Sequence, residues 1–306
     1  MAVRVQVPAS TANLGPAFDC AAIALNLYLR VSAEPRSSAG FEVQYRGENE
    51  DRVAAGEQNL VVKAIRSFAG LGPTAIAGAR IEIENEIPIG VGLGSSAAAI
   101  VAGLLVGAEL AGRKVERSGF LREAAALEHH PDNSTAALCG GFVVAAMIDG
   151  DAGGGADEVL FHRCDVSESL DFIAVTPDRP LPTEKARAVL PAQYSRHDVV
   201  QNLQRVALLT AAFCSGSGLV PELFRDRIHQ PYRSVLIPGI SDCLEFRHEG
   251  LAGVFISGAG SSVMAIATAH AKEIGDALVE RFERNGAAAR ATLLKADNRG
   301  AQILSR

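Results

Sequence analysis

Several segments of the chain alternate between hydrophobic and polar residues with period two, and this pattern predicts strands. The first is residues 3–7, where the alternation stops at Pro8, and residues 41–45 and 81–84 repeat it. Short apolar runs bounded by polar or glycine-rich stretches predict further strands. These are expected at residues 22–31, 140–147, 171–176, 251–256, 263–268 and 289–295.

Other segments place their apolar residues three and four apart, which predicts helices. These are expected at residues 59–69, 95–110, 120–127, 183–190, 198–214 and 271–285. Strands and helices are interleaved without the strict alternation of βαβ units, so the pattern favours an α+β fold over a doubly wound one. A length of 306 residues predicts about two domains. The glycine-rich segment 149–157 is the candidate linker, which gives domains at 1–155 and 156–306.

Composition and charge narrow the class of protein. The chain is 48% hydrophobic and 21% charged, so it has enough apolar residues for a sizeable core. Its net charge of −6 argues against binding to nucleic acid or to an anionic membrane surface, since both need a basic excess. The first residues lack the apolar core of a signal peptide, and the longest apolar run, 97–108, is too short to span a bilayer. We therefore expect a cytoplasmic protein.

The cysteines predict neither a covalent framework nor a metal site. There are five, an odd number, and they are widely spaced without a Cys-x-x-Cys motif. They are Cys20, Cys139, Cys164, Cys214 and Cys243. We expect each to be a structural thiol among apolar or small neighbours rather than part of a disulfide or a zinc site.

Three glycines at alternate positions, Gly90, Gly92 and Gly94, lie between a predicted strand and an apolar helix. Glycine allows backbone conformations and close approaches that other residues do not. The helix directs unpaired N–H groups at the loop, so the segment predicts an anion site. It is not a Walker A loop and has no lysine, so phosphate charge must be met by backbone dipoles, Mg²⁺ and groups from elsewhere. The alternative is a glycine turn capped by Ser95 or Ser96.

Three other polar features each have a purely structural explanation. The loop 9–19 ends in Asp19, and taken alone it is a turn with a capping carboxylate. A second glycine–serine loop, 257–262, could be a tight hairpin. Arg187 and Arg233 are expected to be exposed, as most arginines are.

The densest group of functional side chains is Glu128, His130, Asp132 and Asn133. A zinc site is disfavoured because the spacing fits no common zinc pattern and adjacent histidines point in different directions on most backbones. Glu128 and Asp132 suit Mg²⁺ better, since this hard cation prefers oxygen ligands and binds through carboxylates plus substrate phosphates.

Taken together, these segments resemble the GHMP kinases. Three motifs of that superfamily occur in order, at residues 7–19, 88–98 and 257–260. The similarity is greatest to the homoserine kinase family, whose signatures resemble residues 7–16, 130–133 and 229–233. The resemblance implies an N-terminal domain of the ribosomal S5 domain 2-like type and a C-terminal ferredoxin-like domain. It further implies ATP and L-homoserine in the cleft between them, a place in threonine biosynthesis, and a homodimer.

The resemblance also implies a role for each candidate site residue. The ATP phosphate loop would comprise Pro88, Gly90, Gly92, Leu93, Gly94, Ser95, Ser96, Ala97 and Ala98. The Mg²⁺ ligands would be Ser96 and Glu128. The catalytic residues near the accepting hydroxyl would be His130, Asp132 and Asn133. The residues that bind the amino acid would be Asn13, Asp19, Arg187, Arg233, Gly258 and Gly260.

The chemistry of L-homoserine agrees with these residue types. The substrate carries an ammonium and a carboxylate on one carbon, so its site needs an anion and cations about one substrate length apart. Asp19 can supply the anion, and Arg187 and Arg233 can bind the carboxylate in a bidentate way. Phosphoryl transfer depends mainly on positioning and charge stabilisation, so we expect direct in-line transfer without a compulsory strong base. Asp132 is then more structural than basic, and His130 could take the proton.

The chain departs from the family pattern after Asp19, after Asn133 and at three single positions. At these three positions, Ala17 and His129 replace glycines and Ser261 replaces a proline. His129 matters most, because a glycine there would permit a positive φ next to Glu128. Two alternatives remain open, a GHMP kinase for another small alcohol and a non-catalytic ligand sensor on the same scaffold. The presence of both Ser96 and Glu128 argues against the sensor.

Overall fold

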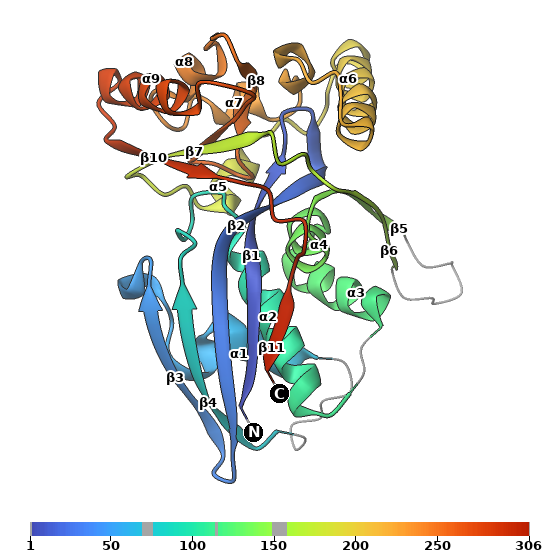
Figure 1. Ribbon diagram of the computed structural model, residues 1–306, viewed down its shortest axis with the longest axis vertical. Coiled ribbons are helices and arrows are strands. Elements are labelled where there is room, and N and C mark those ends of the chain that lie inside the picture. The colour runs from blue at the N-terminus through green and yellow to red at the C-terminus, as the bar shows by residue number, and fades with distance from the viewer. Residues whose placement is uncertain (1, 69–75, 114–115, 149–157, 306) are drawn as a thin grey trace.

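The computed structural model describes residues 2–68, 76–113, 116–148 and 158–305, whose strands form two sheets (Figure 1). The strands are β1 Val3–Asn13, β2 Ala17–Arg36, β3 Gly40–Gly47, β4 Gly78–Asn85, β5 Phe142–Ile148, β6 Glu158–Cys164, β7 Asp171–Pro177, β8 Leu251–Ile256, β9 Val263–Ala267, β10 Ala289–Leu294 and β11 Gln302–Ser305. The seven-stranded sheet has the order β11-β1-β2-β4-β3, with β5 paired to β2 and β6 to β5. The four-stranded sheet has the order β10-β7-β9-β8 and is antiparallel, whereas the larger sheet is mixed because β3 and β4 are parallel. The predicted α+β class is confirmed.

Helices pack against both sheets. They are α1 Leu60–Ser67, α2 Ser95–Leu110, α3 Arg117–Glu128, α4 Asp132–Cys139, α5 Thr183–Ala188, α6 Arg196–Ser215, α7 Gln230–Arg233, α8 Ile240–Leu244 and α9 Ala271–Arg284, with short 3₁₀ turns η1 Glu50–Arg52, η2 Gly56–Gln58 and η3 Pro221–Phe224. In Figure 1 the smaller sheet, with α8 and α9, lies above the larger one, and α9 packs on β7 and β10. Within the described residues, no helix is long and apolar enough to cross a membrane.

Helix α2 is the central helix of the N-terminal part, and its predicted bounds are confirmed. It packs against β1 and β2 on one side and α1 on the other. Small residues make this close packing possible: a Cβ on Gly103 would lie 2.5 Å from the carbonyl oxygen of Val61 and 2.6 Å from Cβ of Ala64. The N-terminus of α2 is therefore held firmly by the core behind it.

The prediction that the first strand ends at Pro8 is wrong. β1 continues to Asn13, and its register with β2 shifts between Pro8 and Ala9, where β2 contains extra residues. A proline is tolerated at such a bulge, because the bulge does not require its missing N–H in the ladder. The extension brings the polar loop after β1 to the place where the other motif loops lie.

Five helices and strands of the described residues were not predicted: α4, α7, α8, β6 and β11. Helix α4 is short and polar at its start, and β11 has only four residues, so neither gives a clear periodic signal. The predicted linker 149–157 lies outside the described residues. The boundary between residues 155 and 156 stays a proposal, but β6 and β11, which both follow it, pair within the larger sheet. If each domain is instead defined by its sheet, the N-terminal domain extends to the end of β6 and also includes the C-terminal strand β11.

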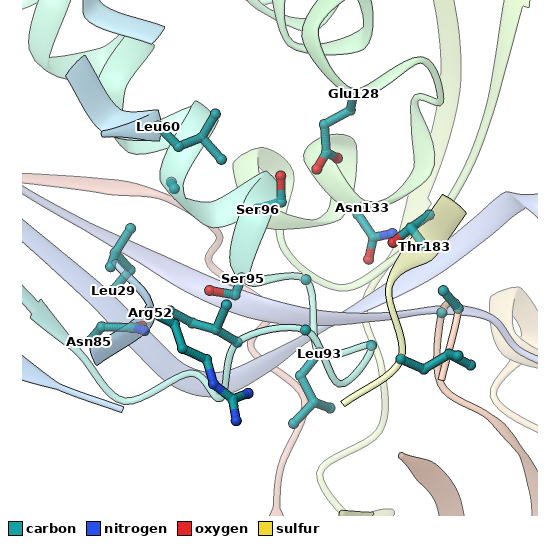
Figure 2. A pocket seen from close by; sticks show the side chains of 18 of the residues that line it. Leu29, Arg52, Leu60, Asn85, Leu93, Ser95, Ser96, Glu128, Asn133 and Thr183 are labelled. Carbon is teal, nitrogen blue, oxygen red and sulfur yellow. The ribbon is translucent and has the colours of Figure 1, made fainter. Parts of the chain in front are cut away.

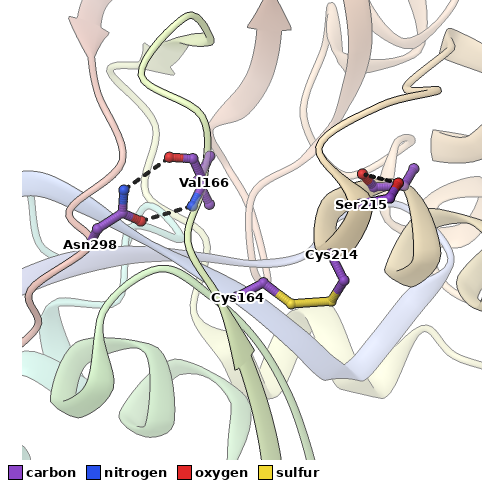
Figure 3. The surroundings of a disulfide bond; sticks show 6 residues. Cys164, Val166, Cys214, Ser215 and Asn298 are labelled. Carbon is purple, nitrogen blue, oxygen red and sulfur yellow. Dashed lines mark hydrogen bonds between the residues drawn. A yellow bond between two sulfur atoms is a disulfide. The ribbon is translucent and has the colours of Figure 1, made fainter.

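The expectation that all five cysteines are thiols is wrong for two of them. Cys164, at the end of β6, and Cys214, near the end of α6, form a disulfide with their Cα atoms 5.4 Å apart (Figure 3). They are separated by 50 residues, so only the folded chain brings them together. The other three, Cys20, Cys139 and Cys243, are free and at least partly buried.

Candidate active site

The three motif loops meet at one place and are hydrogen-bonded to one another. Ser257 Oγ donates to the carbonyl oxygen of Gly92 at 2.6 Å and therefore accepts from Thr11 Oγ1, which lies 2.8 Å away. The N–H of Ser10 donates to the carbonyl oxygen of Leu93 at 3.2 Å. The end of β1, the loop before α2 and the loop after β8 thus form one unit.

The glycine loop needs its glycines for two separate reasons. Gly90, Gly92 and Gly94 have φ values of +76°, +87° and +70°, in the region that side chains disfavour. A Cβ on Gly92 would also lie 2.0 Å from the carbonyl oxygen of Ser257, and one on Gly94 would lie 2.1 Å from Oγ of Ser10. At Gly90 a Cβ would meet no atom closer than 3.7 Å. Contact between loops therefore excludes side chains at the second and third glycines.

The N-terminus of α2 has the geometry of an anion site. Gly94 is its N-cap, no side chain caps this end, and no acidic residue lies in the first turn. The first N–H groups of an α-helix have no partner within the helix, and the helix dipole is positive there. Ser95 and Ser96 line the adjacent cavity, so these N–H groups lie at its wall.

The loops border a cavity of about 450 Å³, a volume typical of small-molecule sites. The predicted site residues that line it are Asn13, Asp19, Gly90, Gly92, Leu93, Gly94, Ser95, Ser96, Glu128, His130, Asp132, Asn133, Arg187, Arg233, Gly258 and Gly260. Pro88, Ala97 and Ala98 do not line it, and the two alanines are instead fully buried. The cavity therefore unites residues from the whole length of the chain.

Glu128 ends α3, and its carboxylate faces the hydroxyl of Ser96 at the start of α2 (Figure 2). Ser96 hydrogen-bonds to this carboxylate, but the oxygen Oε2 is buried with no hydrogen-bond partner among the described residues. Burial raises the pKa of Glu128 to about 7, with Asp132 adding to the rise and His130 and Ser96 opposing it. An unpartnered buried carboxylate oxygen is costly, and a bound cation would remove that cost. Ser96 and Glu128 therefore fit a Mg²⁺ site.

His130, Asp132 and Asn133 form a linked group at the start of α4. His130 Nδ1 lies 2.7 Å from Asp132 Oδ1, which also accepts the N–H of Asn133 at 2.7 Å. Burial lowers the pKa of His130, but the hydrogen bond and charge of Asp132, with the charges of Glu128 and Asp19, outweigh it and raise the pKa to about 9. The buried Asp132 is thus occupied in holding His130 and the first turn of α4.

Asp19 and Arg187 form a bidentate ion pair. Both guanidinium Nη atoms of Arg187 donate to the carboxylate oxygens of Asp19 at 2.8 Å. The expectation of an anion and a cation one substrate length apart is therefore wrong for this pair, because the two groups are in direct contact. Both side chains are partly exposed to the cavity, so a ligand can reach them.

Arg233 is buried, with 1% of its surface exposed, and the expectation of an exposed side chain is wrong. Its Nε donates to the carbonyl oxygen of Ala186 at 3.1 Å, and Nη1 donates to that of Gly258 at 3.2 Å. Burial lowers the pKa of Arg233 to about 10, so the side chain still carries its charge at neutral pH. The guanidinium groups of Arg233 and Arg187 lie 5.0 and 5.5 Å from the ring centroid of Phe18, within the range of a cation–π contact.

A buried polar network that the sequence analysis did not identify supports Arg233. Asp226 Oδ2 accepts the N–H groups of His229 and Gln230 at 2.8 and 2.6 Å, which fixes the start of α7. Burial lowers the pKa of His229, so its imidazole is neutral. Its Nε2–H donates to the carbonyl oxygen of Gly15 at 2.7 Å, and its Nδ1 accepts from Nη1 of Arg233 at 3.3 Å. The network links α7 to the loop after β1.

The side chain of Asn13 forms hydrogen bonds to other residues of the site. Its Oδ1 accepts the N–H of Asp19 at 2.9 Å, and its Nδ2 donates to the carbonyl oxygen of Gly258 at 2.7 Å. Its φ of +73° lies in the left-handed region, where asparagine is better tolerated than most residues. Asn13 thus fixes the position of Asp19 beside the third loop.

Several cavity residues carried no signal in the sequence. Thr183, at the start of α5, and Arg52 both line the cavity, and in the view of Figure 2 they appear beside Asn133 and below Ser95. Other side chains that line the cavity are Leu29, Tyr45, Asn59, Leu60 and Asn85. Most of these come from strands and helices whose other faces form the core, so only the fold reveals that they face a cavity.

The structure explains one of the three single-position departures from the family pattern. His129 is the C-cap of α3 and has a φ of +66°, the conformation for which glycine is best suited. Ala17 and Ser261 are both fully buried, and the hydroxyl oxygen of Ser261 has no hydrogen-bond partner among the described residues. His129 therefore strains the backbone next to Glu128, whereas nothing in the structure explains the other two replacements.

Comparisons with known proteins identify the family of the chain. The chain matches the GHMP kinases N terminal domain over residues 59–141 and the GHMP kinases C terminal domain over residues 208–284. It is 38% identical over 301 residues to a homoserine kinase from Solibacter usitatus, covering 98% of this chain and 96% of the relative. It is 39% identical over 309 residues to one from Caldanaerobacter subterraneus, covering 99% and 95%.

Solved structures give the same result. The crystal structure of homoserine kinase from Cytophaga hutchinsonii superposes with a TM-score of 0.83 at 28% identity, covering 99% of this chain and 97% of that one. A galactokinase from Lactococcus lactis, at 14% identity and a TM-score of 0.63, shares the fold alone. The expected two-domain GHMP kinase fold is confirmed. Because full-length relatives share more than a third of its residues and its motif loops converge on one cavity, the chain belongs to the homoserine kinases of the GHMP kinase family.

Proposed function

We propose that the chain transfers the γ-phosphoryl group of ATP to the side-chain hydroxyl of L-homoserine, giving O-phospho-L-homoserine for threonine biosynthesis. The observation that carries this proposal is the shape of one cavity. A glycine loop at a helix N-terminus borders one part of it, and the Asp19, Arg187 and Arg233 cluster borders another. This lining supports recognition of phosphate and of an amino acid within one cavity.

At the ATP end, backbone groups do most of the binding. The N–H groups of Ser95 and Ser96 lie at the N-terminus of α2, where the helix dipole favours phosphate oxygens. Arg52 is a nearby cation that lines the same cavity. Beyond it, Tyr45 and Asn85 line a wall that combines apolar surface with amide groups, as a purine nucleoside requires.

Ser96 and Glu128 would hold Mg²⁺, the support for this being the buried, unpartnered Oε2 of Glu128. When bound, the ion would supply positive charge for the phosphate oxygens. The Ser96 hydroxyl and the Glu128 carboxylate come from two helices that the core fixes against each other, so the ligands are positioned before the ion arrives.

At the amino-acid end, the Asp19–Arg187 pair is the centre of recognition. An α-amino acid carries its ammonium and carboxylate on one carbon, so a carboxylate and a guanidinium in contact match the two groups side by side. The substrate ammonium would bind Asp19, and its carboxylate would bind Arg187 and Arg233. Asn13 and His229 act as positioning residues, because they hold Asp19 and Arg233 through hydrogen bonds.

The reaction then depends on alignment. Asn133, whose Oδ1 accepts from Ser10 Oγ at 2.8 Å, lies where the hydroxyl of the amino acid would meet the phosphate loop. Asp132 holds His130, and the positive imidazolium can stabilise charge on the transferred group. Direct in-line transfer from ATP to the hydroxyl proceeds without a covalent intermediate on the protein.

A substrate panel tests the proposal. ADP release with Mg·ATP is measured against L-homoserine, L-serine, L-threonine, mevalonate and galactose. We expect the largest kcat/KM for L-homoserine. Turnover confined to mevalonate or galactose would contradict the substrate, and no turnover with any of the five would contradict the enzyme.

The homodimer also remains a proposal, as does the cytoplasmic location. Helix α6 supports a dimer, since Val199, Val200 and Leu203 lie on one side of it and are exposed by 38%, 41% and 60%. Such apolar side chains are typical of a surface covered by a partner. Light scattering should give twice the mass of the chain, and Leu203→Glu should give a monomer. A monomeric wild-type protein would contradict this.

A further inference from the structure

Outside the cleft, three side chains with metal-binding atoms lie together. His162 and Cys164 are two residues apart on β6, so they point to the same face of the strand, and Cys214 reaches them from α6. One ligand atom from each residue lies within 4.8 Å of the other two. None of the three lines the active-site cavity.

The chemistry of this group depends on its redox state. A disulfide sulfur is a poor metal ligand, whereas two thiolates and an imidazole form a donor set typical of zinc. We propose that His162, Cys164 and Cys214 bind a thiophilic divalent cation of the zinc class when the two cysteines are reduced, and that the disulfide closes this site. Three protein ligands leave the fourth tetrahedral position for water.

The redox step balances with an external dithiol. The dithiol gives up two electrons and two protons and becomes a disulfide. The Sγ–Sγ bond of Cys164 and Cys214 breaks, and each sulfur takes one electron and one proton to become a thiol. Binding of the cation then releases the two thiol protons to solvent. Cys164 is partly exposed and Cys214 exposed, so both reductant and cation can reach them.

The backbones on both sides are fixed independently of the disulfide (Figure 3). Asn298 accepts the N–H of Val166 at 2.8 Å and donates to its carbonyl oxygen at 2.9 Å, which holds the chain just after Cys164. On the other side Phe213 is buried and stacks on Phe142 of β5 with ring centroids 4.6 Å apart. After reduction the two cysteines therefore stay close, and side-chain rotation can form the site.

Zinc titration of the oxidised and reduced protein tests the proposal. The protein is reduced with a dithiol, desalted to remove the dithiol, and titrated with ZnCl₂ in competition with a chromophoric chelator. We expect the reduced wild type to bind one equivalent more than the oxidised protein, with a Kd below about 1 μM, because three N/S ligands suffice for such affinity. The double variant Cys164→Ser/Cys214→Ser should lose that equivalent, and any zinc bound at Glu128 should remain in it.

Two single variants provide the matched comparison. His162→Ala should weaken zinc binding by the reduced protein at least tenfold. His197→Ala removes an exposed histidine of α6 that is not part of the cluster, and it should leave zinc binding unchanged. The proposal is overturned if reduction adds no zinc equivalent, or if His162→Ala binds as tightly as wild type. The oxidised and reduced wild type give a decisive comparison even if the double variant does not fold. Kinase activity is not the readout, so failure of the proposed function would not affect this result.

Discussion

The phosphate end and the amino-acid end of the cleft are built from different materials. At the phosphate end, the working groups are backbone N–H groups and glycines within a single stretch of chain, supported by α2. At the amino-acid end, they are charged side chains from segments far apart in sequence, and Asp19 and Arg187 are 168 residues apart. At the first end, contact between loops excludes side chains at Gly92 and Gly94, whereas the second end depends on the charged side chains that it contains.

The largest expected effect is at the phosphate end. Gly92→Ala would place a Cβ 2.0 Å from the carbonyl oxygen of Ser257 at a φ of +87°, so we expect a loss of about 3 kcal/mol of unfolding free energy. At temperatures where the variant stays folded, kcat/KM for ATP should fall at least 100-fold, by about 2.7 kcal/mol.

Gly90→Ala is the matched control for chemical denaturation. Its φ of +76° is similar, but its Cβ would meet no atom within 3.7 Å. The Gly90→Ala variant should lose only about 1 kcal/mol of unfolding free energy. Equal losses in the two variants would show that contact between the loops is unimportant.

The next effect is at the amino-acid end. Arg233→Ala removes a buried charge and leaves the carbonyl oxygen of Gly258 without this donor, so KM for L-homoserine should rise about 100-fold. KM for ATP should stay within about twofold of wild type. Arg225→Ala, which removes an exposed arginine outside the cleft, serves as the control and should change neither constant. An equal rise in both KM values would contradict a division between the two ends.

A smaller effect is expected where the two ends meet. Ser96→Ala removes a hydroxyl that contacts Glu128, so the Mg²⁺ concentration for half-maximal activity should rise about tenfold. Ser96→Thr keeps the hydroxyl and should restore most of the affinity. If Ser96→Ala shows the wild-type Mg²⁺ dependence, the hydroxyl is not a ligand.

The smallest effect concerns the departure at His129. This residue has a φ of +66° at the end of α3, so His129→Gly relieves strain but gives the unfolded chain more freedom. We expect a net gain of about 0.5–1 kcal/mol in urea denaturation. A loss of stability would mean that the imidazole makes a contact worth more than the strain.

The phosphate end is one contiguous stretch of chain and the amino-acid end is assembled from distant segments, and this difference explains how much of the molecule could be predicted. The glycine loop and α2 were predicted within one residue, because a loop and the helix it precedes are contiguous and carry a periodic signal. The burial of Arg233 was not predicted. It depends on Asp226, His229 and the carbonyl oxygen of Gly258, which only the folded chain brings together. A resemblance to a family identified Arg233 as a candidate, but not its environment.

The disulfide and the last strand show the same limit. Neither the spacing of Cys164 and Cys214 nor their neighbours indicated a pair, since the two meet only where the end of α6 packs against the larger sheet. β11 pairs with β1 across nearly the whole chain, and its four residues give too short a pattern to detect. Local signals predicted elements and loops, whereas contacts between distant segments needed the structure.

The most direct test of the two-ended cleft uses truncated substrates. 4-Hydroxybutyrate is L-homoserine without its ammonium group, and 3-amino-1-propanol is L-homoserine without its carboxylate. Steady-state ADP release with each compound gives kcat/KM for the alcohol, and varying ATP at a fixed alcohol concentration gives KM for ATP. The account predicts that kcat/KM falls at least 100-fold for both analogues, because Asp19 or Arg187 and Arg233 lose their partner, while KM for ATP stays near its value with L-homoserine. If either analogue is phosphorylated as efficiently as L-homoserine, the charged cluster does not read the amino acid and the account is wrong.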